Sequence, residues 1–446
     1  MQPDPTGAAL RHETPSPPTP EQRGATAVLR WIAWLVPLAL ATGTAVALFL
    51  WLLDEVTARR VATPWLLWFL PVAGAIVAVL YDRAGRGVER GSNLILDEIH
   101  TPGGGVPGRL APLVLFGTIL THLYGGSAGR EGTAVQMGGS IAGAWDRHVL
   151  PRLGQRHALA ISERRVFLQA GMAAGFSAVF GTPFAGALFA IEVLRVGRLA
   201  HSALLPCVVA ALLADLVTRA WGIQHTAYPT VSAAVALISP ALVAQVAVAA
   251  IMFGLASRLF SLTTHGVSQA LGRLVRLAWL RPVVGGLAVI VLVETLGTRD
   301  YLGLGVSSPD ANAVTILSAF RDGGAERWSW LLKLVFTVIT IGSGFKGGEV
   351  TPLFFIGATL GNTLALWLGA PVELFAALGF VAVFAGATNT PLACTVMAVE
   401  LFGLGALPFF AVACGLAFAV SGPTGVYTAQ RRRDTSVPAI EPPPQL

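Results

Sequence analysis

Apolar segments occupy most of the chain between residues 28 and 420, and charged residues fall mainly between them. Charged residues make up 12% of the sequence, about half of the roughly 25% found in soluble domains. The mean hydropathy of +0.67 implies more apolar surface than the core of a soluble protein could bury. Helices that cross a bilayer satisfy their own backbone hydrogen bonds, so they can carry this much apolar surface. The sequence therefore predicts an all-α, polytopic membrane protein.

Many of the apolar segments are short or are interrupted by glycine and proline. The segment 65–80 falls short of the ~20 residues of a straight span, and 166–193 contains Gly171 and Gly181-Thr182-Pro183. Broken helices are tolerated at membrane depth only where protein covers them or where they line a site. The polar segment 91–100 is expected to line a cavity with its backbone. The other apolar segments are 28–53, 110–123, 203–221, 231–260, 283–293, 331–341, 353–368, 372–387 and 392–420.

A glycine-rich stretch from 125 to 139 carries the pair Arg130-Glu131. Glycine-rich backbone turns tightly and approaches a ligand closely. A helix that begins near Glu131 would aim unpaired N–H groups and a positive dipole end into the loop. Such a helix start is an anion site. The Glu131 carboxylate would compete there with any anion in solution.

A second stretch of the same kind runs from 342 to 357. The two stretches align without a gap when Gly129 is set against Gly348, and the alignment then pairs Gly138 with Gly357. Each half continues with a Thr-Pro pair, followed nine residues after the proline by a lone glutamate, Glu192 or Glu400. The motifs predict two inverted-topology repeats, over 27–222 and 231–430, with the site at their interface near the membrane midplane.

The remaining composition excludes several classes of site. The net charge of +6 fits cytoplasmic arginines better than a nucleic-acid surface. Three cysteines lie in apolar runs without CxxC spacing and are expected to be buried hydrophobes, and neither a metal site nor a cofactor is predicted. No cleavable signal is recognised. Residues 1–26 are predicted to be a disordered cytoplasmic tail, and 431–446 a second cytoplasmic tail. The cysteines are Cys207, Cys394 and Cys414.

Three motifs together resemble the CLC anion channels and transporters over about residues 27–430. They are the Gly-Arg-Glu-Gly sequence at 129–132, the Glu-Val-Thr-Pro sequence at 349–352, and Tyr427. Chloride-type members usually have Gly-Ser-Gly-Ile-Pro where this chain has Gly-Ser-Asn-Leu-Ile at 91–95, and proline where it has Thr133. They also usually have Gly-x-Phe-x-Pro where this chain has Gly-Glu-Val-Thr-Pro at 348–352. All three departures resemble the fluoride-type branch of bacterial fluoride/proton antiporters.

The resemblance implies a role for each matching residue. Glu131 would be the gating and proton-transfer glutamate, and Glu349 and Thr351 would join it in the proton pathway. Tyr427 would reach the central anion site. The fold implied is a homodimer in the bacterial inner membrane, in which each protomer has its own pore and both termini are cytoplasmic. The anion-binding residues implied are Ser92, Asn93, Gly129, Arg130, Gly132, Thr133, Val350, Thr351 and Tyr427.

Several of these residues also have a purely structural interpretation. Glu349 is open to a role as a helix-start acid, Thr351 as an N-cap, and Asn93 as a partner of its own loop backbone. As a ligand, the Asn93 amide offers two N–H donors, which suit a strongly hydrated anion. Tyr427 could instead belong to an interfacial aromatic belt. Glu192, Glu400 and the Phe354-Phe355 pair are expected to be structural, the glutamates as buried carboxylates bonded to helix-start N–H groups or to arginine.

The sequence therefore predicts a proton-coupled antiporter that exports fluoride across the lipid bilayer. A chloride/proton antiporter or chloride channel of the same fold stays open, because Ser92 is the residue that a chloride-type member would have. A membrane-embedded enzyme with Glu131 and Glu349 as an acid/base pair is a third alternative. It is disfavoured because the chain offers neither a nucleophile–His pair nor a metal cluster. Fluoride or chloride and protons are the expected partners, and nucleic acid is not.

Overall fold

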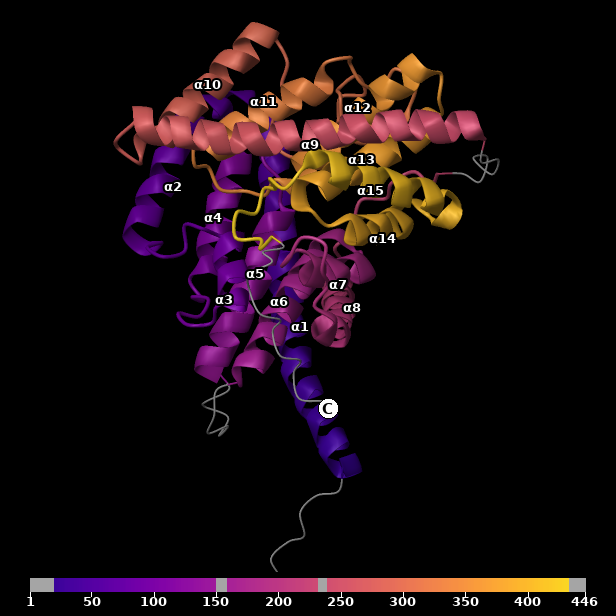
Figure 1. Ribbon diagram of the computed structural model, residues 1–446. Helices are drawn as coiled ribbons and strands as arrows, with labels where there is room; N and C mark the ends of the chain where they lie inside the picture. Colours follow the sequence, from indigo (N-terminus) through magenta and orange to yellow (C-terminus); the bar gives the residue numbers. More distant parts are fainter. Residues whose placement is uncertain (1–19, 150–158, 232–238, 433–446) are drawn as a thin grey trace, which may run out of the picture.

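The computed structural model describes residues 20–149, 159–231 and 239–432, and these residues form fifteen α-helices and no strands (Figure 1). The predicted all-α membrane fold is confirmed. The first half of the chain contains α1 Pro20–Ala62, α2 Leu70–Ala84, α3 Ser92–His100, α4 Leu110–Leu123, α5 Glu131–Ala144, α6 Ile161–Phe180, α7 Pro183–Glu192 and α8 Leu204–Ala220. The second half contains α9 Pro240–Leu274, α10 Leu280–Leu296, α11 Ser329–Gly342, α12 Val350–Leu368, α13 Val372–Thr388, α14 Pro391–Phe402 and α15 Leu407–Ser421.

The helices differ widely in length. Among the described residues, six helical segments are long and apolar enough to cross a membrane, including those of α1, α9 and α12. Helices α4, α7, α11, α13 and α14 are apolar but have only 10–17 residues. Short helices at membrane depth must be covered by protein, and all but one of the residues of α13 are buried. The expectation of short, broken helices is therefore confirmed.

The closest helix packing repeats between the two halves. Helix α5 packs on α6, and α12 packs on α13. A Cβ atom at Gly138 would overlap the carbonyl of Gly171, and one at Gly357 would overlap the carbonyl of Gly379. Gly138 and Gly357 are the two glycines that the sequence alignment pairs. Glycine at these positions lets the helix backbones touch, which is how helices pack tightly in a membrane.

The helix boundaries correct several expectations. Helix α1 begins at Pro20, so 20–26 is helical rather than part of a disordered tail, while 1–19 lies outside the described residues. The segment 91–100 is not a loop: Gly91, with a φ of 53°, turns the chain into helix α3. Helix α9 begins at Pro240, inside the apolar run 231–260, and the Ser239 hydroxyl accepts a hydrogen bond from Leu242 N at its start. Most of the second predicted tail, 433–446, also lies outside the described residues.

The predicted packing role of Phe354 and Phe355 is confirmed. Both side chains are fully buried. Phe354 stacks on Phe380 with ring centroids 3.9 Å apart, and Phe180 and Phe384 complete the cluster around it. This aromatic core joins α6 of the first half to α12 and α13 of the second. It holds the start of α12 against the first half of the chain, where the candidate site lies.

Candidate functional site

The two glycine-rich loops meet backbone to backbone. Gly129 N donates to Gly348 O at 2.6 Å, and Gly348 N donates to Gly129 O at 2.7 Å. The sequence alignment paired the same two residues. A Cβ atom at Gly129 would lie 2.9 Å from Gly348 O, and one at Gly348 would lie 2.8 Å from Gly132 N. Only glycine permits this approach, which brings the starts of helices α5 and α12 together.

The Glu131 carboxylate crosses this junction and lies at the N-terminus of α12. Its Oε2 atom accepts hydrogen bonds from Thr351 N at 3.0 Å and from the Thr351 hydroxyl at 2.5 Å. Arg130 N adds a third bond at 3.2 Å, and Arg130 Nε lies 3.5 Å from Oε1. Glu131 is only 1% exposed. A buried charge needs such donors, and the same set of donors could hold a small anion.

Glu349 lies in the second loop, one residue before the position that aligns with Glu131. It is the N-cap residue of α12, and its Oε2 atom would lie 3.6 Å from a Cβ atom at Gly132, in the first turn of α5. Each of the two loops therefore places a carboxylate near the helix start of the other. Thr351 is not the N-cap, because it is the second residue of α12, and its hydroxyl donates to Glu131.

Two other predicted residues have structural contacts. The Thr133 hydroxyl lies 2.8 Å from the Thr118 hydroxyl on α4, and both side chains are buried. Val350, the first residue of α12, is also buried. The hydrogen bond to Thr118 fixes the Thr133 hydroxyl, so Thr133 helps to position the α5 start.

Asn93 joins the inner loop to the C-terminal segment. Its Oδ1 atom accepts a hydrogen bond from Ala429 N at 2.9 Å, so it binds the backbone of a distant segment rather than its own loop. Tyr427, two residues before Ala429, is buried against Phe189 with ring centroids 6.3 Å apart. This burial argues against an interfacial belt. Within the described ranges, Glu131 hydrogen-bonds to none of Ser92, Asn93 and Tyr427.

Glu192 and Glu400 have the structural role expected of them. The Glu192 carboxylate accepts hydrogen bonds from Leu392 N at 3.0 Å and Ala393 N at 2.7 Å, at the start of α14. Glu400 does the same for the start of α7, accepting from Phe184 N at 3.0 Å and Ala185 N at 2.8 Å. The two glutamates thus cap each other's helices, one from each half of the chain.

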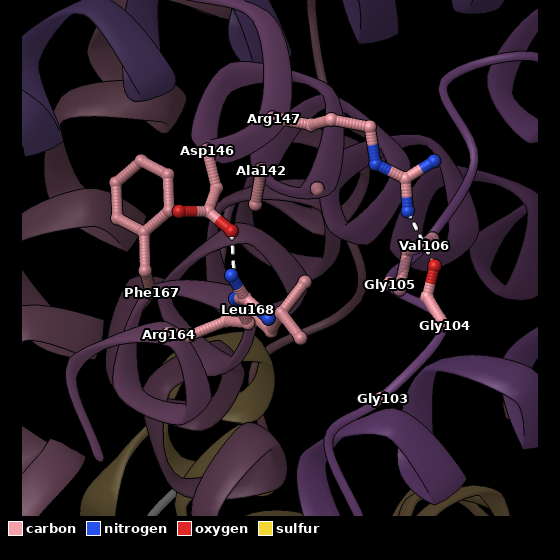
Figure 2. Close-up of a pocket in the computed structure, with 11 residues that line it drawn as sticks. Gly103, Gly104, Gly105, Val106, Ala142, Asp146, Arg147, Arg164, Phe167 and Leu168 are labelled. Atoms are coloured by element: carbon pink, nitrogen blue, oxygen red, sulfur yellow. Dashed lines mark hydrogen bonds and ion pairs between the residues drawn. The ribbon is translucent and has the colours of Figure 1, made fainter. Parts of the chain in front are cut away.

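The cavity shown in Figure 2 lies at the other end of α5, roughly 20 Å along the helix from Glu131. Its volume is about 280 Å³. Arg164 Nε pairs with Asp146 Oδ2 at 2.7 Å, and Arg147 donates to the carbonyl of Gly104. Because its lining includes no residue of the two glycine-rich loops, the cavity is not part of the Glu131 site.

Sequence reasoning missed a group of basic residues beside the gate. Lys333 on α11 is fully buried and its Nζ donates to Gly303 O at 2.7 Å, and Arg60 Nη2 lies against the same glycine. His122 Nε2 lies 3.5 Å from Gly129 O, two residues before Glu131. An ionisable residue inside an apolar segment is by itself a signal of function. Lys333 in the segment 331–341 carried that signal. In the described part of the chain, no group of His, Cys, Asp and Glu is suited to hold a metal ion.

Comparisons with known proteins agree on one family. The family described as voltage gated chloride channel matches residues 73–422. A protein of Pseudomonas syringae pv. tomato, named chloride/fluoride channel protein, is 49% identical over 410 residues, which cover 91% of this chain and 87% of that protein. The voltage-gated ClC-type chloride channel ClcB of Salmonella typhimurium is 27% identical over 312 residues, which cover 68% of this chain and 71% of that protein.

Two solved structures share the fold. The crystal structure of a CLC-type fluoride/proton antiporter has a TM-score of 0.82 and 34% identity, and the match covers 93% of this chain and 100% of that one. The structure of a slow cyanobacterial Cl⁻/H⁺ antiporter has a TM-score of 0.73 and 19% identity, covering 90% and 96% of the two chains. The second likeness concerns the fold alone.

Proposed function

Because this chain belongs to the CLC family of voltage gated chloride channel proteins, we propose that it is a proton-coupled antiporter that exports fluoride, with Glu131 as the gate. The observation that carries the proposal is the position of the Glu131 carboxylate, which takes the N–H and O–H donors of Thr351. A carboxylate and a fluoride ion are both anions that accept such hydrogen bonds. They would therefore compete for one site.

Protonation of Glu131 couples proton movement to fluoride movement, because it decides whether the carboxylate or fluoride occupies the site. An ionised Glu131 holds the donors of Thr351 and faces the positive charge of Arg130. Binding of a proton cancels the charge, weakens these contacts and frees the donors for fluoride. When fluoride leaves, the carboxylate returns and gives up its proton. Proton influx would in this way drive fluoride efflux, with Glu349 and Thr351 beside Glu131 on the proton route.

Fluoride is favoured over chloride by the residues that line the two loops. Thr133 and Asn93 add polar groups where the resembled chloride-type members have proline and glycine, and Val350 stands where they have phenylalanine. Fluoride costs more to dehydrate, so it benefits more from additional donors. The likeness to a relative named chloride/fluoride channel protein and to a fluoride/proton antiporter points the same way. Ser92 favours chloride, because it is the residue that a chloride-type member would have at this position.

The finer assignments rest on the family resemblance. The chain is a multi-pass membrane protein. We further propose that it lies in the bacterial inner membrane as a homodimer of independent protomers, with both termini in the cytoplasm. We assign it no enzymatic activity, since the members that it resembles move ions.

Anion flux from proteoliposomes tests the proposed function. Vesicles that contain the purified protein would be loaded with fluoride or with chloride, and efflux would be followed with an ion-selective electrode and a pH electrode together. We expect fluoride to leave faster than chloride and protons to enter as it leaves. Faster chloride efflux would support the chloride antiporter, and fluoride efflux without proton movement would support a channel.

A further inference from the structure

A histidine and an aspartate face each other near the end of α8, and both side chains are largely buried. Asp215 lies on α8, and His225 lies in the segment that follows this helix. Each side chain is 10% exposed, and His225 Nδ1 lies 3.9 Å from Asp215 Oδ1. In the described part of the chain, neither of these two atoms makes a hydrogen bond. We call the two residues the His-Asp pair.

Hydrogen bonds to the other polar atoms fix how the two groups meet. His225 Nε2 lies 3.0 Å from Ala178 O on α6. A carbonyl oxygen only accepts hydrogen bonds, so Nε2 carries the proton of the neutral ring and Nδ1 is left as an acceptor. Arg219 Nε donates to Asp215 Oδ2 at 2.8 Å, which leaves Oδ1 as the oxygen that faces the ring. Two acceptors therefore face each other, with no donor between them among the described residues.

A proton is the partner that both acceptors lack. Buried polar atoms without a hydrogen bond are costly, and one donor placed between them would remove both costs. A proton on His225 Nδ1 would form a charge-assisted hydrogen bond from the imidazolium to the Asp215 carboxylate. The two atoms would then close from 3.9 Å to about 2.8 Å, the usual length of such a bond.

The surroundings of the pair set the pH at which the proton binds. Burial lowers the pKa of His225 below its ordinary value, and the Asp215 carboxylate opposes this shift. Arg219 and Arg130 lower the pKa of the ring as well, and Glu400 is a further acid within electrostatic reach of Asp215. The pair is therefore empty at neutral pH and fills in acid. Since the Arg219 side chain is 54% exposed, the pair lies just beneath the surface, where water can supply the proton.

Helix α6 connects the pair to the gate. The carbonyl that binds His225 lies one turn after Gly175 on this helix. A Cβ atom at Gly175 would overlap the carbonyl oxygen of Ala134, which lies one turn into α5 from Glu131. The electrostatic influence of Arg130, the residue before Glu131, also reaches the His225 ring. The pair is therefore held close to the start of α5.

We propose that the His-Asp pair is a proton-binding site, which takes protons from water and passes them on to Glu131. The inference rests on the proposed function, because it supplies the proton that releases the gate. In the first step, His225 Nδ1 takes a proton from hydronium, and the imidazolium donates to Asp215 Oδ1. In the second step, the same proton leaves Nδ1 through water for the Glu131 carboxylate, and the ring becomes neutral again.

His225→Gln tests the site, because the glutamine amide can keep the bond to Ala178 O but has no group that titrates. Without the pair, Glu131 must take its proton from water directly, which needs a more acidic solution. We expect the pH at which fluoride transport is half-maximal to fall by about one unit, the scale of a charge interaction at a proton site. The KM for fluoride should stay within about twofold of the wild-type value, since the pair does not hold the anion.

Asp215→Asn is the second variant. It keeps the His225 ring and removes the charge that favours a proton there, so it should shift the pH profile in the same direction by about one unit. It also carries the test if His225→Gln does not fold. A merely structural role for the pair would lower the rate equally at every pH, and such a uniform loss without a shift would overturn the proposal.

His265→Gln is the matched control. His265 Nε2 also bonds to a backbone carbonyl, Gly425 O, at 3.0 Å. Over the described ranges, no carboxylate oxygen lies within 4.0 Å of the His265 ring. An unchanged pH profile in folded His225→Gln would overturn the proposal. An equal shift in His265→Gln would also overturn it, because loss of any similar histidine would then have the same effect.

Nitrogen NMR separates failure of this site from failure of the proposed function. The full-length protein would be labelled with nitrogen-15 histidine, and the His225 signals are those absent from His225→Gln. We expect Nδ1 to become protonated as the pH falls, and Asp215→Asn to lower the midpoint by about one unit. This result would support the site even if the wild-type protein moved no fluoride, in which case only the antiport proposal fails. An Nδ1 atom that stays unprotonated down to the lowest pH at which the protein is folded would refute the site, whatever the transport assay shows.

Discussion

The Glu131 carboxylate belongs to the first half of the chain, but two of its hydrogen bonds come from Thr351 in the second half. The two residues are 220 positions apart. Sequence motifs could identify both as site residues, because each lies in a glycine-rich helix start. The bond between them could not be predicted, since it depends on how two distant loops dock. The same is true of Asn93 and Ala429, which are 336 positions apart.

Thr351→Val removes the hydroxyl that donates to Glu131 and keeps the shape of the side chain. A hydrogen bond to a charged group contributes about 1.5–3 kcal/mol, so we expect fluoride transport to slow about tenfold or more. Thr359→Val is the control: Thr359 lies two turns further along α12 and donates to its own helix, at Phe355 O. The ion-electrode assay measures both variants. Equal rates in the two would show that the Thr351 hydroxyl does not hold the gate.

Asn93→Ala should change selectivity rather than only the rate. It removes the amide and the hydrogen bond to Ala429, and thereby loosens the segment that carries Tyr427. We expect the ratio of fluoride to chloride flux to narrow about tenfold, the scale of one lost hydrogen bond. Ser92→Ala should narrow it less, because a hydroxyl there is shared with the chloride-type pattern. An unaltered ratio in a folded Asn93→Ala protein would move selectivity to Thr133 and Val350-Thr351.

At the scale of helices, the reciprocal capping by Glu192 and Glu400 joins α7 in the first half of the chain to α14 in the second. Both α7 and α14 begin with proline, so the N–H groups that follow are the first that need acceptors. Because Glu192 and Glu400 are each the lone acid in an apolar segment, their buried, structural role could be predicted from the sequence. Which helix each would cap did not follow from the sequence, because it needs the antiparallel packing of α7 on α14.

Glu192→Gln should destabilise the protein without a direct effect on the gate. The amide presents N–H donors to the helix start, and an unsatisfied buried donor costs about 1–3 kcal/mol. We expect a lower melting temperature in detergent, and a similar decrease for Glu400→Gln. Glu373→Gln, an exposed acid in the first turn of α13, is the control. A shift no larger than that of the control would argue against the capping role.

Helix α3 shows where the sequence was insufficient at this scale. Its glycine and amide resembled a loop at the edge of a cavity, yet Ile95, Leu96 and Ile99 are buried side chains of a short helix. Nine residues are too few for a helical period to stand out from the pattern. The helical conformation of α3 depends on its packing against α5 and α6. The boundary of α1 was missed for a related reason, because polar residues before the apolar run can still be helical.

For the whole molecule, the internal repeat was the most informative prediction. Aligning Gly129 with Gly348 from sequence identified the pair whose backbones bond in the structure. The two backbones can approach this closely only at glycine, so the contact could be recognised from the glycine pattern of the sequence. The basic residues Arg60, His122 and Lys333 show no comparable sequence pattern, because they come from three separate helices.

Assembly is a further prediction at this scale. We expect a homodimer, so particles in a mild lipid-like detergent should contain twice the 46.5 kDa chain mass. Mass photometry with detergent subtraction measures this, and chemical cross-linking at low protein concentration provides an independent measurement. Particles with a single chain by both methods would contradict the dimer and leave the fold unaffected.

The central claim is that one carboxylate serves both ions, and proton pumping in Glu131→Gln tests it most directly. Vesicles containing the wild-type protein or the variant would be given a fluoride gradient with no initial pH difference, and a pH electrode would follow the protons. We predict that the wild-type protein drives protons uphill and that the variant, correctly folded, moves none. Uphill proton movement by Glu131→Gln at the wild-type rate would contradict the account, because the shared gate would then lie elsewhere.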